Sequence, residues 1–174
     1  MRNYEKELEN RVAFIRKMLT DSGCEGIVYG NSGGKDSALV GILCKKACEN
    51  TVGILLPCAT TQNYGSDTDD ALRVAQQFGI ACRTVDLTES RGAVVAALEK
   101  SGVQLNNAAV SNIAPRLRMT ALYAIAAAEH RLVAGTGNRS EAFMGYCTKW
   151  GDAAADFNPI ADLSVTEVFE FLDY

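Results

Sequence analysis

Glycines, hydroxyls and one carboxylate occur together at residues 30–37, which read Gly-Asn-Ser-Gly-Gly-Lys-Asp-Ser. An apolar run precedes this stretch and a helical pattern follows it, so we expect a turn between a strand and a helix. At such a turn backbone N–H groups bind phosphate oxygens, and glycine lets a ligand approach the backbone closely. Asp36 would repel a phosphate unless a cation lay between them. The stretch therefore predicts a phosphate-binding loop that uses Mg²⁺, which prefers carboxylate and phosphate oxygens.

A second polar stretch, residues 135–159, contains many glycines and charges and is longer than a plain connection needs to be. Glu141 is a second candidate carboxylate for Mg²⁺. Lys149, Asp152 and Asp156 are polar groups spaced along the same stretch. We expect this stretch to be a loop that carries part of a binding site, although each charge alone could also be a solvated surface group.

Apolar periodicity predicts an alternation of helices and strands. Helical spacing is found at residues 4–19, 38–48, 67–78, 92–98, 113–129 and 164–172, and short apolar runs predict strands at residues 26–29, 51–56, 81–85 and 131–134. Residues 101–111 are polar and are expected to form a loop, which puts Pro115 in the first turn of the next helix, where proline is tolerated. The alternation predicts an α/β fold, a doubly wound parallel sheet with helices on both faces.

The carboxyl ends of the strands are the expected ligand-binding edge of such a sheet. We expect four parts of the chain to gather there: the loop at Gly30, the segment after Pro57, Asp86, and the segment after Gly135. The two candidate carboxylates for Mg²⁺ would then lie close together although they are far apart in the sequence.

Length and composition restrict the kind of protein. A chain of 174 residues is expected to form one domain, 1–174, with a real core. Its net charge of -4 argues against nonspecific binding to nucleic acid, which needs a basic surface. No apolar run is long enough to cross a membrane and the charged N-terminus lacks a signal-peptide core, so a cytoplasmic protein is expected. Six cysteines without a Cys-x-x-Cys pair, and a single histidine, predict buried free thiols rather than a zinc site.

The loop at residues 30–37 fits neither of two familiar nucleotide loops. Lys35 and Asp36 stand at the helix start where a Walker loop has its glycine and lysine, and Ser32 stands where the dinucleotide fingerprint needs glycine. The string Ser-Gly-Gly-Lys-Asp-Ser instead resembles the pyrophosphate loop of the N-type ATP pyrophosphatases. Members of that superfamily cleave ATP between its α and β phosphates and adenylate a substrate. A glycine-rich turn without a ligand is the alternative.

Three further blocks make the resemblance more specific: residues 116–119 with the alanine-rich helix after them, residues 135–141, and residues 149–156. Together with the loop they resemble the ammonia-dependent NAD synthetases, from about residue 26 to the end of the sequence. That family makes NAD from deamido-NAD, ATP and ammonia. The resemblance implies an adenine nucleotide alpha hydrolase-like sheet and a homodimer with active sites near the interface. Neither a nucleic-acid nor a membrane partner is expected, on the net charge and the apolar runs described above.

The resemblance also implies roles for the matching positions. ATP would be bound by Gly30, Ser32, Gly33, Gly34, Lys35, Asp36, Ser37 and Thr136. Asp36 and Glu141 would ligate Mg²⁺, and Lys35 would also be catalytic. Deamido-NAD would be contacted by Arg116, Lys149 and Asp156, whereas Tyr146 and Trp150 could stack on a substrate ring or simply pack. The sequence departs from the family at Ala153 and Ala154, where glycines are expected.

The expected chemistry needs few catalytic side chains. The nicotinate carboxylate of deamido-NAD is already a nucleophile, so the first step needs in-line placement and neutralisation of the departing pyrophosphate. In the second step ammonia attacks the acyl-adenylate and AMP leaves. Ammonium must first lose a proton, and Asp152 is our candidate acceptor. No amidase domain is visible, so ammonia would come from solution or from a separate protein.

Two alternatives stay open at this point. One is another adenylating member of the superfamily, similar to GMP synthetase or to the tRNA-thiolating enzymes, although paired reactive cysteines and a basic face are not evident. The other is a nucleotide-binding sensor without turnover. Release of pyrophosphate that depends on deamido-NAD would separate an enzyme from a sensor.

The last predicted helix has a full start signal, because Ser164 and Glu167 form the pattern of a capping box. It has no glycine or proline stop before Tyr174, and the NAD synthetases continue for several further elements. We therefore expect the domain to be incomplete at its C-terminal end. On this interpretation the 174 residues bind ATP weakly and make NAD poorly.

Overall fold

A single parallel sheet organises the computed structural model, which describes residues 2–58 and 64–174, with the backbone alone for 64–68. Its four strands have the order β3-β2-β1-β4, and every neighbouring pair is parallel. The strands are β1 (Gly26–Gly30), β2 (Thr51–Leu55), β3 (Ala81–Thr84) and β4 (Arg131–Ala134). All four were predicted to within one residue at each end, and the predicted α/β fold class is confirmed.

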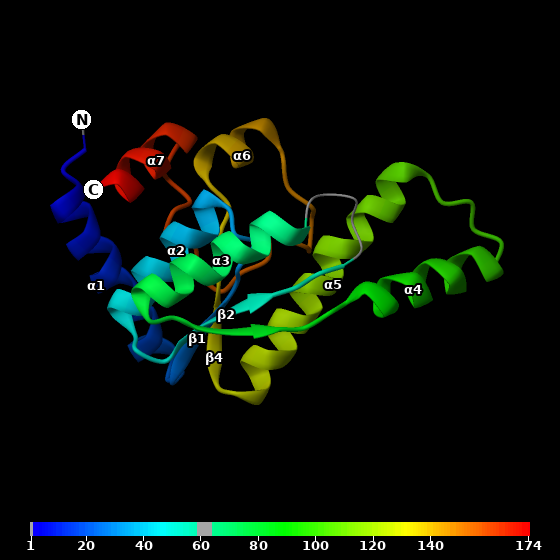
Figure 1. Cartoon of the computed structure of the whole chain (residues 1–174), viewed down its shortest axis with the longest axis horizontal. Helices are drawn as coiled ribbons and strands as arrows, with labels where there is room; N and C mark the ends of the chain where they lie inside the picture. Colours follow the sequence, from blue (N-terminus) through cyan, green and yellow to red (C-terminus); the bar gives the residue numbers. More distant parts are fainter. Residues whose placement is uncertain (1, 59–63) are drawn as a thin grey trace.

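Seven helices connect or flank these strands within the described residues (Figure 1). They are α1 (Tyr4–Ser22), α2 (Lys35–Ala47), α3 (Tyr64–Phe78), α4 (Thr88–Lys100), α5 (Asn107–Ala128), α6 (Arg139–Met144) and α7 (Val165–Asp173). The capping box predicted for α7 is present. Ser164 Oγ accepts from the N–H of Glu167 (3.3 Å), and Glu167 Oε2 accepts from the N–H of Ser164 (2.7 Å).

Each face of the sheet has its own core, because strand side chains alternate between the faces. Ile27 and Tyr29 of β1 lie in the core that α1, α2, α3 and α7 cover. Val28 lies in the opposite core, which α5 covers. In β4, Leu132 and Val133 divide between the two cores in the same way. The helices therefore lie on both faces, as the alternation in the sequence predicted.

The predicted loop at residues 101–111 is wrong in its second part, because α5 already begins at Asn107. The Asn106 side chain caps the helix by accepting from the N–H of Ala109 (2.8 Å). Pro115 consequently lies inside α5 rather than in its first turn. A proline removes one backbone hydrogen bond from a helix interior. The helix continues past it because its later turns pack on β1 and β4.

A helical arm extends from the body of the protein. In Figure 1, α4 and the N-terminal part of α5 run outward, away from the sheet. The helix α4 packs against α5, and no residue of α4 is buried. Val94 of α4 is 37% exposed and Val103, in the turn after it, is 46% exposed. The arm thus presents apolar side chains that the described part of the chain does not cover.

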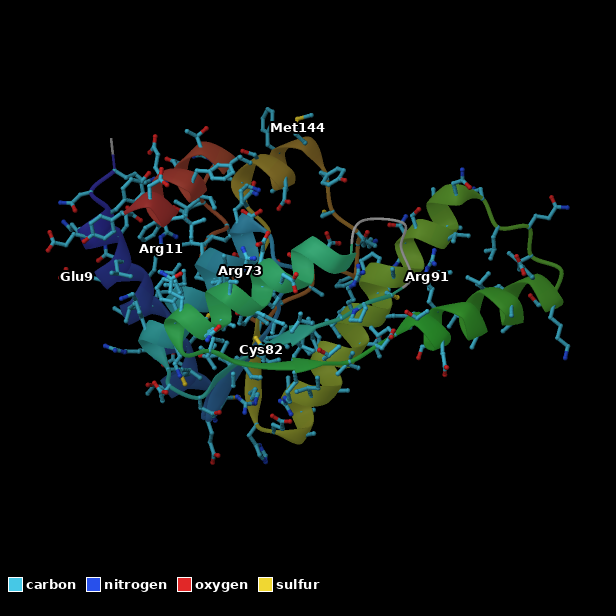
Figure 2. All side chains as sticks on the ribbon, viewed as in Figure 1. Glu9, Arg11, Arg73, Cys82, Arg91 and Met144 are labelled. Atoms are coloured by element: carbon cyan, nitrogen blue, oxygen red, sulfur yellow. The ribbon has the colours of Figure 1, made fainter. Side chains whose placement is uncertain are left out.

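Ion pairs join the two ends of the described chain, which lie near each other in Figure 1. Arg11 of α1 is buried and lies toward α7 in Figure 2. Its guanidinium donates to both carboxylate oxygens of Asp162, at 2.7 and 3.0 Å, and lowers the pKa of that carboxyl to about 2. Arg2 donates to Glu167 (2.8 Å) in the capping box of α7. These bonds fix the segment before α7 against α1.

The cysteines that the sequence predicted to be buried are buried only in part. Cys44 and Cys58 are buried, whereas Cys147 is exposed. Burial raises the pKa of the Cys44 and Cys58 thiols, which keeps them protonated and unreactive. No helix among residues 2–58 and 64–174 has the length and apolar character that a membrane crossing requires.

Close packing around Tyr29 generates a stability prediction. A Cβ added at Gly41 of α2 would lie 2.3 Å from the hydroxyl oxygen of Tyr29, whose ring is 1% exposed and cannot move aside. We expect Gly41→Ala to lower the free energy of unfolding by about 2 kcal/mol, because an overpacked core forces neighbours out of place. Urea denaturation measures the change.

Gly92→Ala is the matched control, because Gly92 also lies inside a helix and nothing lies within 4 Å of an added Cβ. It should raise stability by roughly 0.5 kcal/mol, since alanine loses less entropy in a helix. Equal effects of the two substitutions would mean that the Tyr29 packing is not as described.

Candidate active site

The candidate site lies where the strand order changes direction. The chain passes from β1 to β2 and β3 on one side, then returns to place β4 on the other side of β1. Because the pairs are parallel, the segments after β1 and β4 leave the sheet at the same edge, as the register Tyr29↔Ala134 requires. Such a switch point is the usual ligand crevice of a doubly wound sheet. The predicted meeting of the Gly30 and Gly135 segments is confirmed.

Asn31 fixes the start of the phosphate loop. Its backbone N–H donates to Ile54 O of β2 (2.8 Å), and its buried side-chain amide donates to Ala71 O of α3 (3.3 Å). The same side chain accepts from the N–H of Gly33 (3.4 Å), where φ is 82°. That backbone conformation favours glycine. The sequence interpretation gave Asn31 no role, because a polar residue in a glycine-rich turn looks like an ordinary loop residue.

Two serine hydroxyls lie at the turn into α2. Ser37, 2% exposed, donates to Gly34 O (2.9 Å), and its Oγ lies 3.2 Å from Ser32 Oγ. Gly34 is the N-cap residue of α2 and has no side chain with which to cap it. Within the described part of the chain, the first-turn N–H groups are therefore left without a side-chain cap, and an anion suits that position.

Most of the predicted phosphate and metal residues line one cavity of about 130 Å³. Both candidate carboxylates, Asp36 of α2 and Glu141 of α6, are among them. The lining is Ser32, Gly34, Asp36, Ser37, Thr136, Gly137, Glu141 and Asp152. Hydroxyls, backbone amides and carboxylates from segments far apart in the sequence thus converge on a space of the size of a small polar group.

Asn138 connects the two carboxylates and is the second residue that the sequence interpretation missed. Its Nδ2 donates to Asp36 Oδ1 (3.1 Å), and its Oδ1 accepts from the N–H of Glu141 (3.0 Å). Glu141 Oε2 in turn accepts from the N–H of Asn138 (3.0 Å), which completes a capping box at the start of α6. Residues 135–159 are therefore not all loop. The pattern Asn-x-x-Glu was a capping signal that could have predicted this short helix.

Lys35 lies beside this cavity and is bound to one of its carboxylates. Its ammonium lies 2.8 Å from Asp36 Oδ2 and 5.7 Å from the ring centre of Phe169 of α7. Among the described residues that line the cavity, Lys35 does not appear, and neither does Gly33. The predicted contact of Lys35 with phosphate and its catalytic role stay predictions that require the ammonium to move from its present partner.

A larger open groove of about 1120 Å³ adjoins the small cavity. Gly30, Ser32, Thr136 and Asp152 line it, and Ser32, Thr136 and Asp152 also line the cavity. Its walls are the end of β2, the middle of α5 and residues 145–154, with apolar side chains such as Leu56, Met119 and Leu122 among polar ones. Such mixed, concave sites suit a ligand with an aromatic ring and polar groups.

The loop with Asp152 is attached to α5. Thr148 Oγ1 bonds to Asn112 Oδ1 (2.7 Å), and Asp152 Oδ1 accepts from the N–H of Thr148 (2.6 Å). Gly151 is buried against Pro115, so closely that an added Cβ would lie 3.1 Å from Pro115 Cβ. The proline inside α5 is thus part of the surface on which this loop rests.

Two of the residues predicted to contact deamido-NAD lie together. Arg116 Nε donates to Lys149 O (3.2 Å), and both side chains are exposed. The Lys149 ammonium lies 5.9 Å from the centre of the Trp150 ring, and that ring is 69% exposed. The pair forms a small cationic surface in an acidic chain, beside the groove-lining residues Pro115 and Thr148.

Asp156 has two partners inside the protein. Its Oδ2 accepts from the N–H of Val133 in β4 (2.7 Å), and its Oδ1 accepts from the hydroxyl of Tyr123 (3.2 Å). Its own N–H donates to Val133 O (2.9 Å), so this residue covers part of the free edge of β4. Burial and the Asp156 carboxylate raise the pKa of Tyr123. The predicted contact of Asp156 with substrate stays a prediction.

Of the other segments expected at this edge, Asp86 follows β3, which is parallel to β2. It is not among the described residues that line the cavity or the groove, and its carboxylate accepts from the N–H of Thr88 (2.8 Å) at the start of α4. Pro57 lines the groove, but residues 59–63 after it lie outside the described residues.

Asp36 and Glu141 are suitable partial ligands for Mg²⁺. Across residues 2–58 and 64–174 there is no group of three or more His, Cys, Asp or Glu side chains that could hold a metal. Mg²⁺ usually takes only one or two carboxylates and completes its shell with phosphate oxygens and water. The two carboxylates beside a phosphate loop therefore fit a cation that binds together with a nucleotide.

Comparison with known proteins agrees with this geometry. The chain is 41% identical over 174 residues to the NH(3)-dependent NAD(+) synthetase of Carboxydothermus hydrogenoformans. The aligned region covers 99% of this chain and 70% of that protein. The structure matches an NH3-dependent NAD synthetase from Campylobacter jejuni with a TM-score of 0.90 at 33% identity, over 99% of this chain and 73% of that one. It also matches NMN synthetase from Francisella tularensis with a TM-score of 0.92 at 32% identity. That match covers 100% of this chain and 71% of the Francisella chain.

The sequence profile of the NAD synthase family matches residues 7–174. The profile thus includes the phosphate loop, both candidate carboxylates and the groove. The chain belongs to the NAD synthase family.

Proposed function

We propose that this chain catalyses the ATP-dependent amidation of deamido-NAD by ammonia, which gives NAD, AMP and pyrophosphate. One observation carries the proposal: a phosphate loop and two carboxylates share a cavity that opens into a groove for an aromatic ligand, in a chain of the NAD synthase family. The related protein of Carboxydothermus hydrogenoformans is named an NH(3)-dependent NAD(+) synthetase, which supports ammonia as the nitrogen donor.

The phosphates of ATP are assigned to the small cavity. The uncapped first-turn N–H groups of α2 and the Ser32 and Ser37 hydroxyls are the proposed neutral donors there, and Thr136 lines the same cavity from the segment after β4. Gly30 and Thr136 also line the groove, which is therefore the proposed place of the adenosine. Fixed donors of this kind stabilise the charge that develops on departing pyrophosphate without reorganising.

Mg²⁺ is assigned to Asp36 and Glu141. When bound, it neutralises phosphate charge and makes the α phosphorus more electrophilic. The two side chains hold oxygens toward one cavity from different segments of the chain, and Lys35 compensates the charge of Asp36 at 2.8 Å. In this proposal Lys35 moves to the phosphates when ATP arrives, which would account for its predicted catalytic role.

Deamido-NAD is assigned to the outer side of the groove, where Arg116 and Lys149 provide the local cations that an acidic chain needs for an anionic substrate. Its nicotinate carboxylate would attack the α phosphorus and form an acyl-adenylate. Asp152 lines both the groove and the cavity, and one of its oxygens is held by the N–H of Thr148. We therefore assign to Asp152 the role of taking a proton from ammonium before ammonia attacks the acyl carbon.

The active form is proposed to be a homodimer that uses the helical arm. Exposed Val94 and Val103 lie on that arm, and α4 has no buried residue of its own. A contiguous exposed apolar patch marks a surface that another chain covers, and we assign Val94 and Val103 to such a patch. The arm also carries the first turns of α5, and later turns of this helix line the groove.

The substrate test must distinguish deamido-NAD from nicotinic acid mononucleotide, because one relative of known structure is named an NMN synthetase. We expect pyrophosphate and AMP to appear in equal amounts when deamido-NAD, ATP, ammonium and Mg²⁺ are all present. Nicotinic acid mononucleotide is the competing substrate. Faster turnover with the mononucleotide would contradict the proposed substrate, and nucleotide binding without any pyrophosphate release would favour a sensor.

The metal assignment predicts that Asp36→Asn and Glu141→Gln each lower kcat/KM about 100-fold, since each removes one charged ligand that acts at the transition state. Glutamine at 141 can still accept from the N–H of Asn138, so the start of α6 should survive. Steady-state kinetics at limiting Mg²⁺ measures the loss. Asp21→Asn and Glu9→Gln are matched controls on the exposed surface of α1. Near-normal turnover in either site variant would exclude that residue as a ligand.

The substrate assignment predicts that Arg116→Ala and Lys149→Ala each weaken deamido-NAD binding about tenfold while ATP binding changes little, because a charge-assisted bond to an anion is lost. Isothermal titration with each ligand separates the two effects. Arg73 of α3, which is labelled in Figure 2, provides the matched control Arg73→Ala. It is exposed and lies 3.8 Å from Asp70. An equal loss for ATP and deamido-NAD would show that the assignment is wrong.

A further inference from the structure

The buried side chain of Asn138 has more partners than a helix cap needs. It is 1% exposed and uses its amide nitrogen on Asp36 and its amide oxygen on the N–H of Glu141. A cap requires the second of these bonds only. The first bond reaches from the segment after β4 to the first turn of α2, so it joins two segments that the sequence separates widely.

The position of Asn138 is fixed independently of Asp36. Its neighbour Arg139 donates from its backbone N–H to Leu163 O (2.7 Å), and Asn158 Nδ2 donates to Gly137 O (2.8 Å). Gly135 is held in the same way by Phe157 O (2.8 Å). Residues on both sides of Asn138 are thus attached to the segment 157–163. The amide is a fixed donor toward which Asp36 orients, rather than a side chain that follows the carboxylate.

The chemistry of the position suits an amide better than any side chain of similar size. Only an amide offers a donor to Asp36 and an acceptor to the N–H of Glu141 from one rigid plane. Serine could cap the helix but could not reach the carboxylate as a donor at the same time. Aspartate could cap it too, but would put a third negative charge beside Asp36.

We propose that Asn138 is a positioning residue: it orients the Asp36 carboxylate and fixes it relative to Glu141, so that both face one divalent cation in the cavity. The inference rests on the proposed function, because it takes Asp36 and Glu141 as the metal ligands. One oxygen of Asp36 is occupied by Asn138 and the other by Lys35, at 3.1 and 2.8 Å. The movement of Lys35 to the phosphates would then expose one oriented carboxylate oxygen to the cation.

The test uses Mn²⁺ as the probe and an ATP analogue with a methylene group between the α and β phosphorus atoms. Electron paramagnetic resonance measures the Mn²⁺ affinity of the complex, and titration of the analogue without metal measures nucleotide binding. We expect Asn138→Ser to weaken Mn²⁺ binding at least tenfold with little change in metal-free nucleotide affinity.

Asn106→Ser is the matched control for folding, because Asn106 caps α5 in the same way and is exposed. It should leave Mn²⁺ affinity unchanged. A second comparison keeps the inference testable if Asn138→Ser also lowers the melting temperature. In an Asp36→Asn background, Asn138→Ser should cause no further loss of Mn²⁺ affinity, since residues that act as one unit are not additive.

The outcomes separate this inference from the proposed function. Loss of Mn²⁺ affinity in Asp36→Asn with wild-type affinity in Asn138→Ser would overturn the role of Asn138 and leave the metal assignment intact. An additive loss in the double variant would show that Asn138 acts through the fold and not through Asp36, and would also overturn it. Wild-type Mn²⁺ affinity in Asp36→Asn would remove the metal assignment, and the inference with it.

Discussion

The parallel pairing of β1 with both β2 and β4 is the constraint on which the site depends. It makes three strands end at one edge, so that the phosphate loop after β1 and the Asn138 segment after β4 must meet. Neither segment forms a site alone: one supplies amides, hydroxyls and Asp36, and the other supplies Thr136 and Glu141. The helices act mainly by burying the sheet between two cores, which keeps this edge in register.

Side-chain amides hold the segments at that edge in place. The Asn31 amide ties the phosphate loop to α3, the Asn138 amide ties α6 to α2, and the Asn158 amide ties Gly137 to the segment before α7. Loops with exposed backbone would otherwise be mobile, because their polar groups can bond to water as readily as to the protein. An amide that donates and accepts at once can fix two segments without adding charge beside bound phosphates. This would let the site keep its shape before ATP and a cation arrive.

The sequence predicted the parts of this arrangement that local patterns determine. Four strands, the alternation of helices, the glycine-rich turn at residues 30–37 and its junction with α2 followed from periodicity and glycine chemistry. The start of α5 was missed because a polar stretch hid the cap at Asn106, and Pro115 was placed in the first turn because no local signal shows that tertiary packing sustains a helix across a proline. The orienting role proposed for Asn138 could not be predicted, since only the strand order brings Asn138 close to its partner Asp36. The contacts of Asp156 with Val133 and Tyr123 depend on that order too.

The central claim is that the loop after β1 and the segment after β4 build one site for a nucleotide with its cation. A crystal structure with Mn²⁺ and the methylene analogue of ATP, read from the anomalous signal of manganese, tests it most directly. We predict one manganese peak within bonding distance of Asp36, Glu141 and phosphate oxygens, with the triphosphate against Ser32–Ser37. A nucleotide bound elsewhere, or manganese that contacts neither carboxylate, would contradict the account.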